Sequence, residues 1–294
     1  MPSTGVSRMS EADFTQIRPL TGREFDQIRR LAYQTFGLDL KDGKEHLVSA
    51  RLGKLIRQLG LRSFREYLEY VQDESTGHAL TSMVDALTTN YTSFNREPAH
   101  FDYLRSQIIP QLRNHDRITL WSAACSTGEE PYTLAFCLLE ELGDAAASRI
   151  RILATDISTR ALDVCRAGIY PAERFQVFPM DWHRKYLLRG SGKWKGSYRI
   201  KSQVARLIDF QQRNLMDSFA GIGPFPVIFC RNIMIYFDKA TQEGLVNRMA
   251  ACLEPGGYLM LGHSEGLSGI NHSLTYVRPA IYRKTVSVLA GSRT

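Results

Sequence analysis

The sequence predicts an α/β protein, in which a doubly wound, mostly parallel sheet follows a small all-helical domain. Three observations carry this prediction. Short apolar runs that end in polar residues alternate with helical segments from residue 118 onward. The chain before residue 89 shows helical periodicity only, and a glycine-rich basic stretch interrupts the alternation. We therefore expect a helical domain at 1–88 and a second domain at 89–294, with an antiparallel β insertion at about 173–205.

Length and composition agree with this division. The chain has 294 residues, which favours two domains, and its net charge is +7. Residues 173–206 alone hold nine basic and two acidic residues, so the surplus is local. The five cysteines are widely spaced and form no zinc motif, so we expect reduced thiols and no metal. No apolar leader or 18-residue uncharged run occurs, which predicts a cytoplasmic protein without membrane insertion.

The helical domain begins with a capping signal. Thr21 followed by Glu24 predicts the start of a helix, and Gly37 predicts its end. The helix expected from Glu45 to Leu59 has two stripes. One is apolar (Val48, Leu52, Leu55, Leu59), and the other is basic (Arg51, Lys54, Arg57). The basic stripe is either the solvated flank of a core helix or a docking surface for an acidic helix. Two further helices are expected at Ser63–Val71 and Thr81–Leu87.

The centre of the second domain is the stretch ITLWSAACSTGEE, residues 118–130. The run from Ile118 to Ala124 predicts a buried parallel strand, which is followed by a turn of small residues at Cys125–Gly128. A helix through Tyr132–Leu142 follows. The turn lacks the glycine fingerprint of dinucleotide sites, and the acidic pair Glu129-Glu130 opposes a bound phosphate. The pattern therefore favours a positively charged, adenosine-like cofactor.

The other strands of this domain also end in polar side chains. A helix at Ala99–Leu112 precedes the first strand, and further strands are expected at Ile150–Thr155, Leu207–Gln211, Val227–Cys230 and Tyr258–Gly262. A helix at Lys239–Leu253 and a single last strand at Tyr276–Arg283, finishing the sheet as an antiparallel hairpin, complete the domain. Ligands of open parallel sheets bind at the carboxyl ends of strands, where this chain has Ser126–Glu130, Asp156, Asn214 and Arg231-Asn232. Asp156 either binds ribose hydroxyls or caps the next helix.

Six stretches of the second domain resemble the CheR family of S-adenosylmethionine-dependent methyltransferases. They are TTNYTSFNREPAHF (88–101), WSAACSTGEEPYTLA (121–135), ATDIS (154–158), NL (214–215), IFCRNIMIYFD (228–238) and LEPGGYLMLGHSE (253–265). The resemblance implies a Rossmann-like class I methyltransferase sheet. It also implies methyl transfer from S-adenosylmethionine to glutamate side chains of chemoreceptors, with S-adenosylhomocysteine as product.

The same resemblance implies a set of site residues. The cofactor site would be lined by Asn90, Thr92, Arg96, Glu130, Asp156, Asn214, Leu215, Arg231 and Asn232. Arg96 and Tyr236 would lie nearest the transferred methyl group. The alternatives are a surface salt bridge for Arg96 and a core aromatic for Tyr236. This chain departs from the family pattern at Asn95, where an aromatic residue is usual, which bears on how Arg96 is held.

The implied chemistry agrees with the residues present. A glutamate with an ordinary pKa near ~4.3 is already ionised at neutral pH, so methyl transfer to it needs no general base. The reaction needs carboxylate, methyl group and sulfonium to be in line. Arg96 can hold a carboxylate through two parallel hydrogen bonds, and Tyr236 can fix its approach.

The basic insertion has two interpretations. In the family a small β-subdomain at this place can bind the C-terminal tail peptide of some receptors, and RGSGKWKGSYRI (189–200) resembles tail-binding members in length. Arg189 and Arg199 would then contact the peptide. The alternative is a generic basic flap.

Two other functions remain open at this point. One is an S-adenosylmethionine enzyme that methylates nucleic acid or another substrate. We expect no nucleic-acid partner, because the positive charge is local and no surface of interleaved aromatic and basic residues is evident. The other is a non-catalytic cofactor sensor. The presence of Arg96 and Tyr236 argues against it, because a sensor needs a cofactor site but no residues for methyl transfer. We expect a monomer whose partner is the cytoplasmic domain of chemoreceptors.

Overall fold

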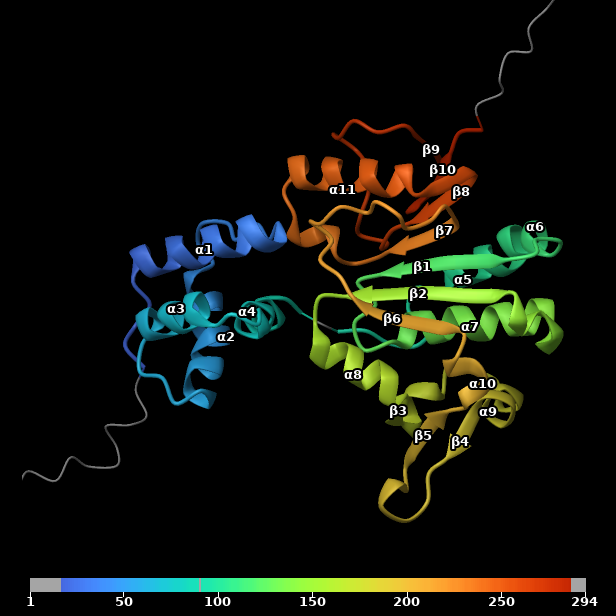
Figure 1. Cartoon of the computed structure of the whole chain (residues 1–294), viewed down its shortest axis with the longest axis horizontal. Coiled ribbons are helices and arrows are strands. Elements are labelled where there is room, and N and C mark those ends of the chain that lie inside the picture. Colours follow the sequence, from blue (N-terminus) through green and yellow to red (C-terminus); the bar gives the residue numbers. More distant parts are fainter. Residues whose placement is uncertain (1–16, 90, 287–294) are drawn as a thin grey trace, which may run out of the picture. The chain divides into compact units, whose positions relative to one another are not determined.

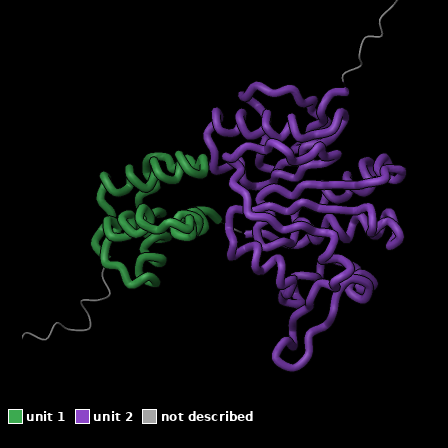
Figure 2. The backbone as a smooth tube through the Cα atoms, viewed as in Figure 1, with its two compact units in different colours: residues 1–89 green, residues 90–294 purple. Residues whose placement is uncertain are grey.

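The chain divides into two compact units, residues 1–89 and residues 90–294 (Figure 2). Figure 1 shows the computed structural model, which describes residues 17–89 and 91–286. Each unit is described by itself below. Among the described residues, no helix is both long enough and apolar enough to cross a membrane.

The first unit consists of helices. They are α1 (Gly22–Phe36), α2 (Glu45–Gln58), α3 (Phe64–Asp73) and α4 (His78–Leu87). The predicted capping box is confirmed, because the Thr21 N–H donates to the Glu24 carboxylate at 2.8 Å and the Glu24 N–H donates back to the Thr21 hydroxyl. Gly37 ends α1 with φ = 70°, a left-handed conformation that glycine adopts without steric cost. Buried side chains from all four helices form the core of this unit.

The predicted apolar stripe of α2 was wrong at its C-terminal end. Val48, Leu52 and Ile56 are fully buried, four residues apart, whereas Leu59 is 42% exposed. The helix ends at Gln58, so Leu59 no longer continues the face that points into the core. Leu55 is half-buried, so the buried face is shifted from the predicted stripe towards Ile56.

The second unit is built on a seven-stranded sheet with the order β6-β2-β1-β7-β8-β10-β9 (Figure 1). Its strands are β1 (Ile118–Ala123), β2 (Ile150–Asp156), β6 (Ile208–Gln212), β7 (Phe225–Cys230), β8 (Leu253–Met260), β9 (Leu274–Arg278) and β10 (Ile281–Lys284). The first five are parallel, and β10 pairs antiparallel with both β8 and β9. The strand order reverses beside β1, where a doubly wound sheet binds its ligands.

The predicted antiparallel hairpin is confirmed, but the prediction of one last strand was wrong. Two strands, β9 and β10, occupy that stretch and are joined through Pro279 and Ala280. Ala280 has φ = 61°, which reverses the chain without a glycine. Pro279 marked this turn in the sequence, since proline interrupts a strand, whereas the left-handed conformation of Ala280 was not expected.

Helices cover both faces of the sheet and give two cores. Along β1, Leu120 belongs to one cluster and its neighbour Trp121 to the other, as expected for side chains that alternate across a strand. The first core includes α7 (Glu129–Leu142), α8 (Thr159–Ala167) and one continuous helix of α5 (Pro98–Tyr103), the π-turn η2 (Leu104–Ile108) and α6 (Ile109–Leu112). The second includes α11 (Lys239–Ala251).

A three-stranded antiparallel sheet with the order β3-β5-β4 projects from this unit (Figure 1). Its elements are β3 (Ile169–Pro171), η4 (Ala172–Phe175), α9 (Met180–Tyr186), β4 (Leu187–Arg189), η5 (Gly192–Trp194) and β5 (Ser197–Ile200), followed by α10 (Ser202–Ala205). The helix α9 was not predicted from the sequence. Its aromatic side chains pack on α7, where the rings of Tyr186 and Phe136 stack with centroids 5.0 Å apart. We call residues 169–205 the insertion.

The insertion explains why α7 is apolar almost all round. Every side chain from Pro131 to Leu139 is buried. One side of α7 faces the main sheet, and the other faces the aromatic residues of the insertion. The insertion is therefore packed into the core of the second unit and is not a loose appendage.

Candidate active site at the carboxyl ends of the parallel strands

The backbone at the strand ends adopts unusual conformations. Of the six non-glycine residues described with positive φ, five lie in this region. They are Asn95 (51°), Glu97 (58°), Ala124 (59°), Ser126 (49°) and Asn232 (59°). Such conformations cost free energy and concentrate at functional sites, because the surrounding structure must hold them in place. The strand ends are therefore built for a specific geometry.

One buried cation organises the site. Arg231 follows β7, and its side chain is only 2% exposed. Its guanidinium donates to Glu97 at 2.9 Å, to Glu130 at 3.1 Å and to the carbonyl oxygen of Arg96. Three predicted site residues are thus joined with one carboxylate, Glu97, that the sequence analysis missed. Glu97 directly follows Arg96 and has no pattern of its own that could have revealed it.

The pKa values of the two carboxylates bound by Arg231 shift in opposite directions. Burial raises the pKa of Glu97, but the hydrogen bond and positive charge of Arg231 outweigh it and bring the pKa down to about 2. Burial raises the pKa of Glu130 above its ordinary value, and here Arg231 and the Ser122 hydroxyl, which donates at 2.7 Å, only oppose the rise. A further positive charge beside Glu130 would favour its ionised form.

The segment after β7 is held by a second carboxylate that the sequence did not reveal. Glu265 is buried and accepts backbone N–H groups of Asn232 at 2.8 Å and Met234 at 2.7 Å, together with those of Ile235 and Gly262. The turn η6 (Met234–Tyr236) carries the half-buried side chain of Tyr236. A side chain at Gly262 would lie 2.4 Å from Asn232 Nδ2, so glycine is required there. This packing fixes Asn232 and Tyr236 relative to the strand end.

The segment before α5 presents Arg96. Its Nη1 donates to the carbonyl oxygen of Tyr91 at 2.8 Å, and the guanidinium lies 5.9 Å from the centre of the Tyr91 ring. Asn95 adopts the left-handed conformation, which asparagine tolerates better than most residues, and its N–H donates to Thr133 at 3.2 Å. The departure from the family pattern at Asn95 therefore fits its backbone. The predicted residue Thr92 is half-buried in the same segment, and Asn90 lies outside the described residues.

The second strand contributes Asp156. Its carboxylate accepts the N–H of Ser126 at 2.7 Å and the N–H of Ser158 at 2.9 Å. It thus anchors the turn Cys125–Gly128, while Ser158 itself caps α8. The Asp156 carboxylate supports the loop that follows β1. Ribose binding by the same group remains a prediction.

The predicted site residues Asn214 and Leu215 follow the strand β6. The side chain of Asn214 accepts the N–H of Met216 at 3.0 Å, which shapes the turn after β6. Leu215 is buried, and its carbonyl oxygen accepts a hydrogen bond from Arg248 at 2.7 Å. Both residues are at the expected strand end.

One group of side chains near Arg231 has donor atoms close enough for a metal ion. Glu97, His100 and His263 place ligand atoms within 4.8 Å of one another. However, the Arg231 guanidinium binds the same carboxylate at 2.9 Å, and its positive charge opposes a cation. Burial lowers the pKa of His100 to about 4, which keeps the ring neutral at physiological pH.

The predicted partner residues lie elsewhere. Arg51 donates to the Leu87 carbonyl and to Thr89 at 2.8 Å, so it closes the end of α4, whereas Lys54 and Arg57 are exposed. In the insertion, Arg189 pairs with Tyr198 and Arg199 pairs with Leu188 across neighbouring strands. Paired residues share a face, so Arg189 and Arg199 lie on opposite faces of the small sheet. The structure does not bring these two arginines together.

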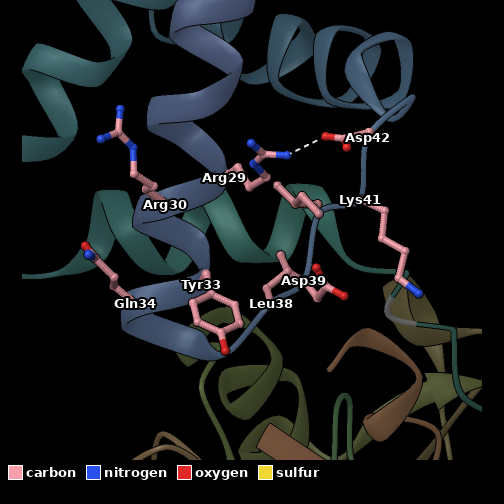
Figure 3. Close-up of a pocket in the computed structure, with 9 residues that line it drawn as sticks. Arg29, Arg30, Tyr33, Gln34, Leu38, Asp39, Lys41 and Asp42 are labelled. Atoms are coloured by element: carbon pink, nitrogen blue, oxygen red, sulfur yellow. Dashed lines mark hydrogen bonds and ion pairs between the residues drawn. The ribbon is translucent and has the colours of Figure 1, made fainter. Parts of the chain in front are cut away.

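A cavity of about 660 Å³ lies in the first unit, between α1 and the segment Leu38–Asp42 (Figure 3). Of its charged side chains, Arg29 binds Asp42 at 2.5 Å, and it also binds Asp26, which is outside the lining, at 2.8 Å.

Comparisons with known proteins identify the family of this chain. The family described as "CheR methyltransferase, SAM binding domain" matches residues 90–282, and "CheR methyltransferase, all-alpha domain" matches residues 23–88. "Chemotaxis protein methyltransferase 2" of Pseudomonas aeruginosa is 41% identical over 263 residues, covering 89% of this chain and 93% of the relative. "Chemotaxis protein methyltransferase" of Escherichia coli is 36% identical over 269 residues, covering 91% and 93%. The chain, in which Arg231 joins Glu97 and Glu130, belongs to the CheR family of S-adenosylmethionine-dependent methyltransferases.

Proposed function

We propose that this protein transfers the methyl group of S-adenosylmethionine to glutamate carboxylates of chemoreceptors, forming methyl esters during sensory adaptation. The observation that carries the proposal is the site that Arg231 assembles, in which Arg96, Glu130 and Asn232 from separate segments meet at the strand ends. The names of the relatives, which are chemotaxis methyltransferases, support the pathway.

The charge of the site supports a cationic cofactor. S-adenosylmethionine carries positive charge on its sulfonium and its amino group. Two carboxylates, Glu97 and Glu130, bind the buried guanidinium of Arg231, and a third, Asp156, lies at the end of β2. In our proposal Glu130 faces the positive end of the cofactor and Asp156 faces its ribose hydroxyls. Thr92, Asn214, Leu215, Asn232 and Asn90 complete the contacts, and Arg231 acts by holding Glu97 and Glu130.

The reaction itself makes modest demands on the protein. The attacking glutamate carboxylate is already ionised at neutral pH, so no side chain has to remove a proton. Placing the carboxylate, methyl group and sulfur in line supplies up to roughly 7–11 kcal/mol of the lowering of the barrier. One N–H of Arg96 goes to the Tyr91 carbonyl, and we propose that its other donors hold the substrate carboxylate. Tyr236 then fixes the direction of approach.

Two basic surfaces are proposed for the receptor. On α2 the exposed pair Lys54 and Arg57 would bind the acidic helices of the receptor's cytoplasmic domain, whereas Arg51 supports the end of α4. On the insertion, an extended tail peptide would add to an open edge of the small sheet and contact Arg199 on one face and Arg189 at the β4 edge. In this proposal the enzyme acts as a cytoplasmic monomer.

The experiment that tests the proposed function uses purified protein, labelled S-adenosylmethionine and membranes that contain receptors of its own organism. We expect label on the receptor that is released by mild base, as for a carboxyl methyl ester. Binding of S-adenosylhomocysteine without any base-labile methyl group on the receptor would support a cofactor sensor. Label on nucleic acid would support the other enzyme class.

A further inference from the structure

The insertion contacts the cofactor turn directly. Tyr170 lies on β3, and its hydroxyl donates to the carbonyl oxygen of Thr127 at 2.7 Å. Thr127 is part of the turn Cys125–Gly128 that leaves β1. The contact is close-packed, because a side chain at Gly128 would lie 2.9 Å from the Tyr170 hydroxyl. The turn therefore rests on the insertion.

An ion pair makes a second connection between the same two segments. Arg174 lies in η4, and its guanidinium binds the carboxylate of Glu129, the first residue of α7. Glu129 is fully buried, and its other carboxylate oxygen accepts a hydrogen bond from the Thr127 hydroxyl at 2.7 Å. Thr127 is thus held through its carbonyl by Tyr170 and through its hydroxyl by Glu129, which Arg174 binds in turn.

The insertion also supports the segment that carries Arg96. Phe94 is buried against Phe175 with ring centroids 4.4 Å apart, and against Tyr170 at 5.2 Å. The two segments that approach the proposed cofactor, one before Arg96 and one after β1, therefore pack on the same few residues of the insertion.

The turn needs such support. Ser126 and Gly128 have φ of 49° and 96°, on either side of Thr127. A backbone with two left-handed residues so close together keeps its shape only where neighbours hold it. Glu129 was the residue of the acidic pair without an assigned role, and its burial with Arg174 provides one.

We propose that Tyr170 and Arg174 are positioning residues for the cofactor, which hold the turn Cys125–Gly128 in its binding shape through Thr127 and Glu129. The inference rests on cofactor binding by the domain at residues 90–282 and does not depend on which substrate accepts the methyl group. The insertion is in this account a structural part of the cofactor site, in addition to any role in receptor binding.

The test measures binding of S-adenosylhomocysteine to the full-length protein by calorimetry. Tyr170→Phe removes one hydroxyl and keeps the buried ring, so the variant folds, and we expect its Kd to rise at least about threefold. For Arg174→Ala we expect a rise of about tenfold, equivalent to about 1.4 kcal/mol. Arg174→Lys, which keeps the charge beside Glu129, is expected to recover most of the affinity.

The matched control is Arg184→Ala, which removes an exposed arginine of α9 in the same insertion. We expect wild-type affinity for it. In turnover assays the positioning variants should show a raised KM for S-adenosylmethionine and a nearly unchanged kcat, because saturating cofactor restores the shape of the turn. An unchanged Kd in Tyr170→Phe and Arg174→Ala, or an equal rise in Arg184→Ala, overturns the proposal. Because the binding measurement needs no receptor, a failure of the proposed receptor function would leave this result intact.

Discussion

Arg231 and Glu97 form an ion pair at 2.9 Å between a residue that follows β7 and a residue that precedes α5. The pair is almost entirely shielded from water, with side-chain exposures of 2% and 14%. The same guanidinium binds Glu130 at 3.1 Å, so one positive charge serves two carboxylates. Removing it would leave two buried like charges close together, which is far more costly than the loss of a surface salt bridge.

The first prediction concerns this ion pair. Arg231→Met is expected to lower the free energy of unfolding of the second unit by about 3–5 kcal/mol, because it leaves buried carboxylates without a partner. The chain's three tryptophans, Trp121, Trp182 and Trp194, all lie in the second unit, so tryptophan fluorescence during urea denaturation reports on it alone. Arg160→Met, at an exposed position on α8, is the control. Equal stability of the two variants would show that Arg231 does not make this contribution to the free energy of unfolding.

Arg96 is predicted to act mainly on turnover. Arg96→Ala removes the guanidinium that is proposed to hold the substrate carboxylate, so kcat should fall by about a hundredfold or more, while the Kd of S-adenosylhomocysteine changes by less than about threefold. Radiolabel transfer and calorimetry measure the two quantities separately. An equal loss of turnover and of affinity for S-adenosylhomocysteine would assign Arg96 to cofactor binding alone.

The basic surface of α2 can be tested without disturbing the fold. Lys54 and Arg57 are exposed, whereas Arg51 holds the end of α4. The double variant Lys54→Glu and Arg57→Glu should raise the KM for receptor by about tenfold at low salt and leave the binding of S-adenosylhomocysteine unchanged. Lys41→Glu, a charge reversal at another exposed position of the same unit, is the control. Unchanged methylation in the double variant would show that Lys54 and Arg57 are only the solvent-exposed side of a core helix.

The buried His100 ring is predicted to make the stability of the second unit depend on pH. Burial lowers its pKa to about 4 from 6.5, so the unfolded chain takes up the proton first. The contribution of the neutral His100 ring to the stability of the second unit is therefore complete above pH 6.5 and is lost as the pH falls towards 4. The shift limits this loss to no more than about 3 kcal/mol.

The measurement compares wild type with His100→Gln between pH 7 and 5, by urea denaturation. This range lies above the lowered pKa of Glu97, which stands at about 2. The groups that face His100 are Glu97, Arg231, His263 and Arg278. We expect the wild type to lose more stability than the variant on acidification, and His46→Gln, at an exposed site on α2, to behave as wild type. Parallel curves for wild type and His100→Gln would contradict the account.

Much of the fold could be predicted because local chemistry determines it. Thr21 and Glu24 predicted the start of α1, and Gly37 its end. Prediction failed at the turn between β9 and β10, where Pro279 was a signal and Ala280 adopts an unexpected left-handed conformation. It also failed at α9, which is short and owes its stability to aromatic packing on α7.

The candidate site was predictable only in part, for a physical reason. Residues at strand ends, such as Asp156 and Asn232, could be placed because parallel strands bring their carboxyl ends together. Glu97 and Glu265 could not, because they act through contacts with residues far away in the sequence, at Arg231 and at the turn η6. The structural role of Glu129 likewise depends on Arg174, which reaches it from the insertion.

The most direct test of the central claim is the location of the transferred methyl group. Receptor incubated with the protein and S-adenosylmethionine is digested and sequenced by tandem mass spectrometry, beside a sample treated with Arg96→Ala. We predict methyl esters on glutamate residues of the receptor's cytoplasmic domain, and their absence when those glutamates are replaced by alanine. Methylation of lysine, arginine or another group, with glutamate unmodified, would contradict the account.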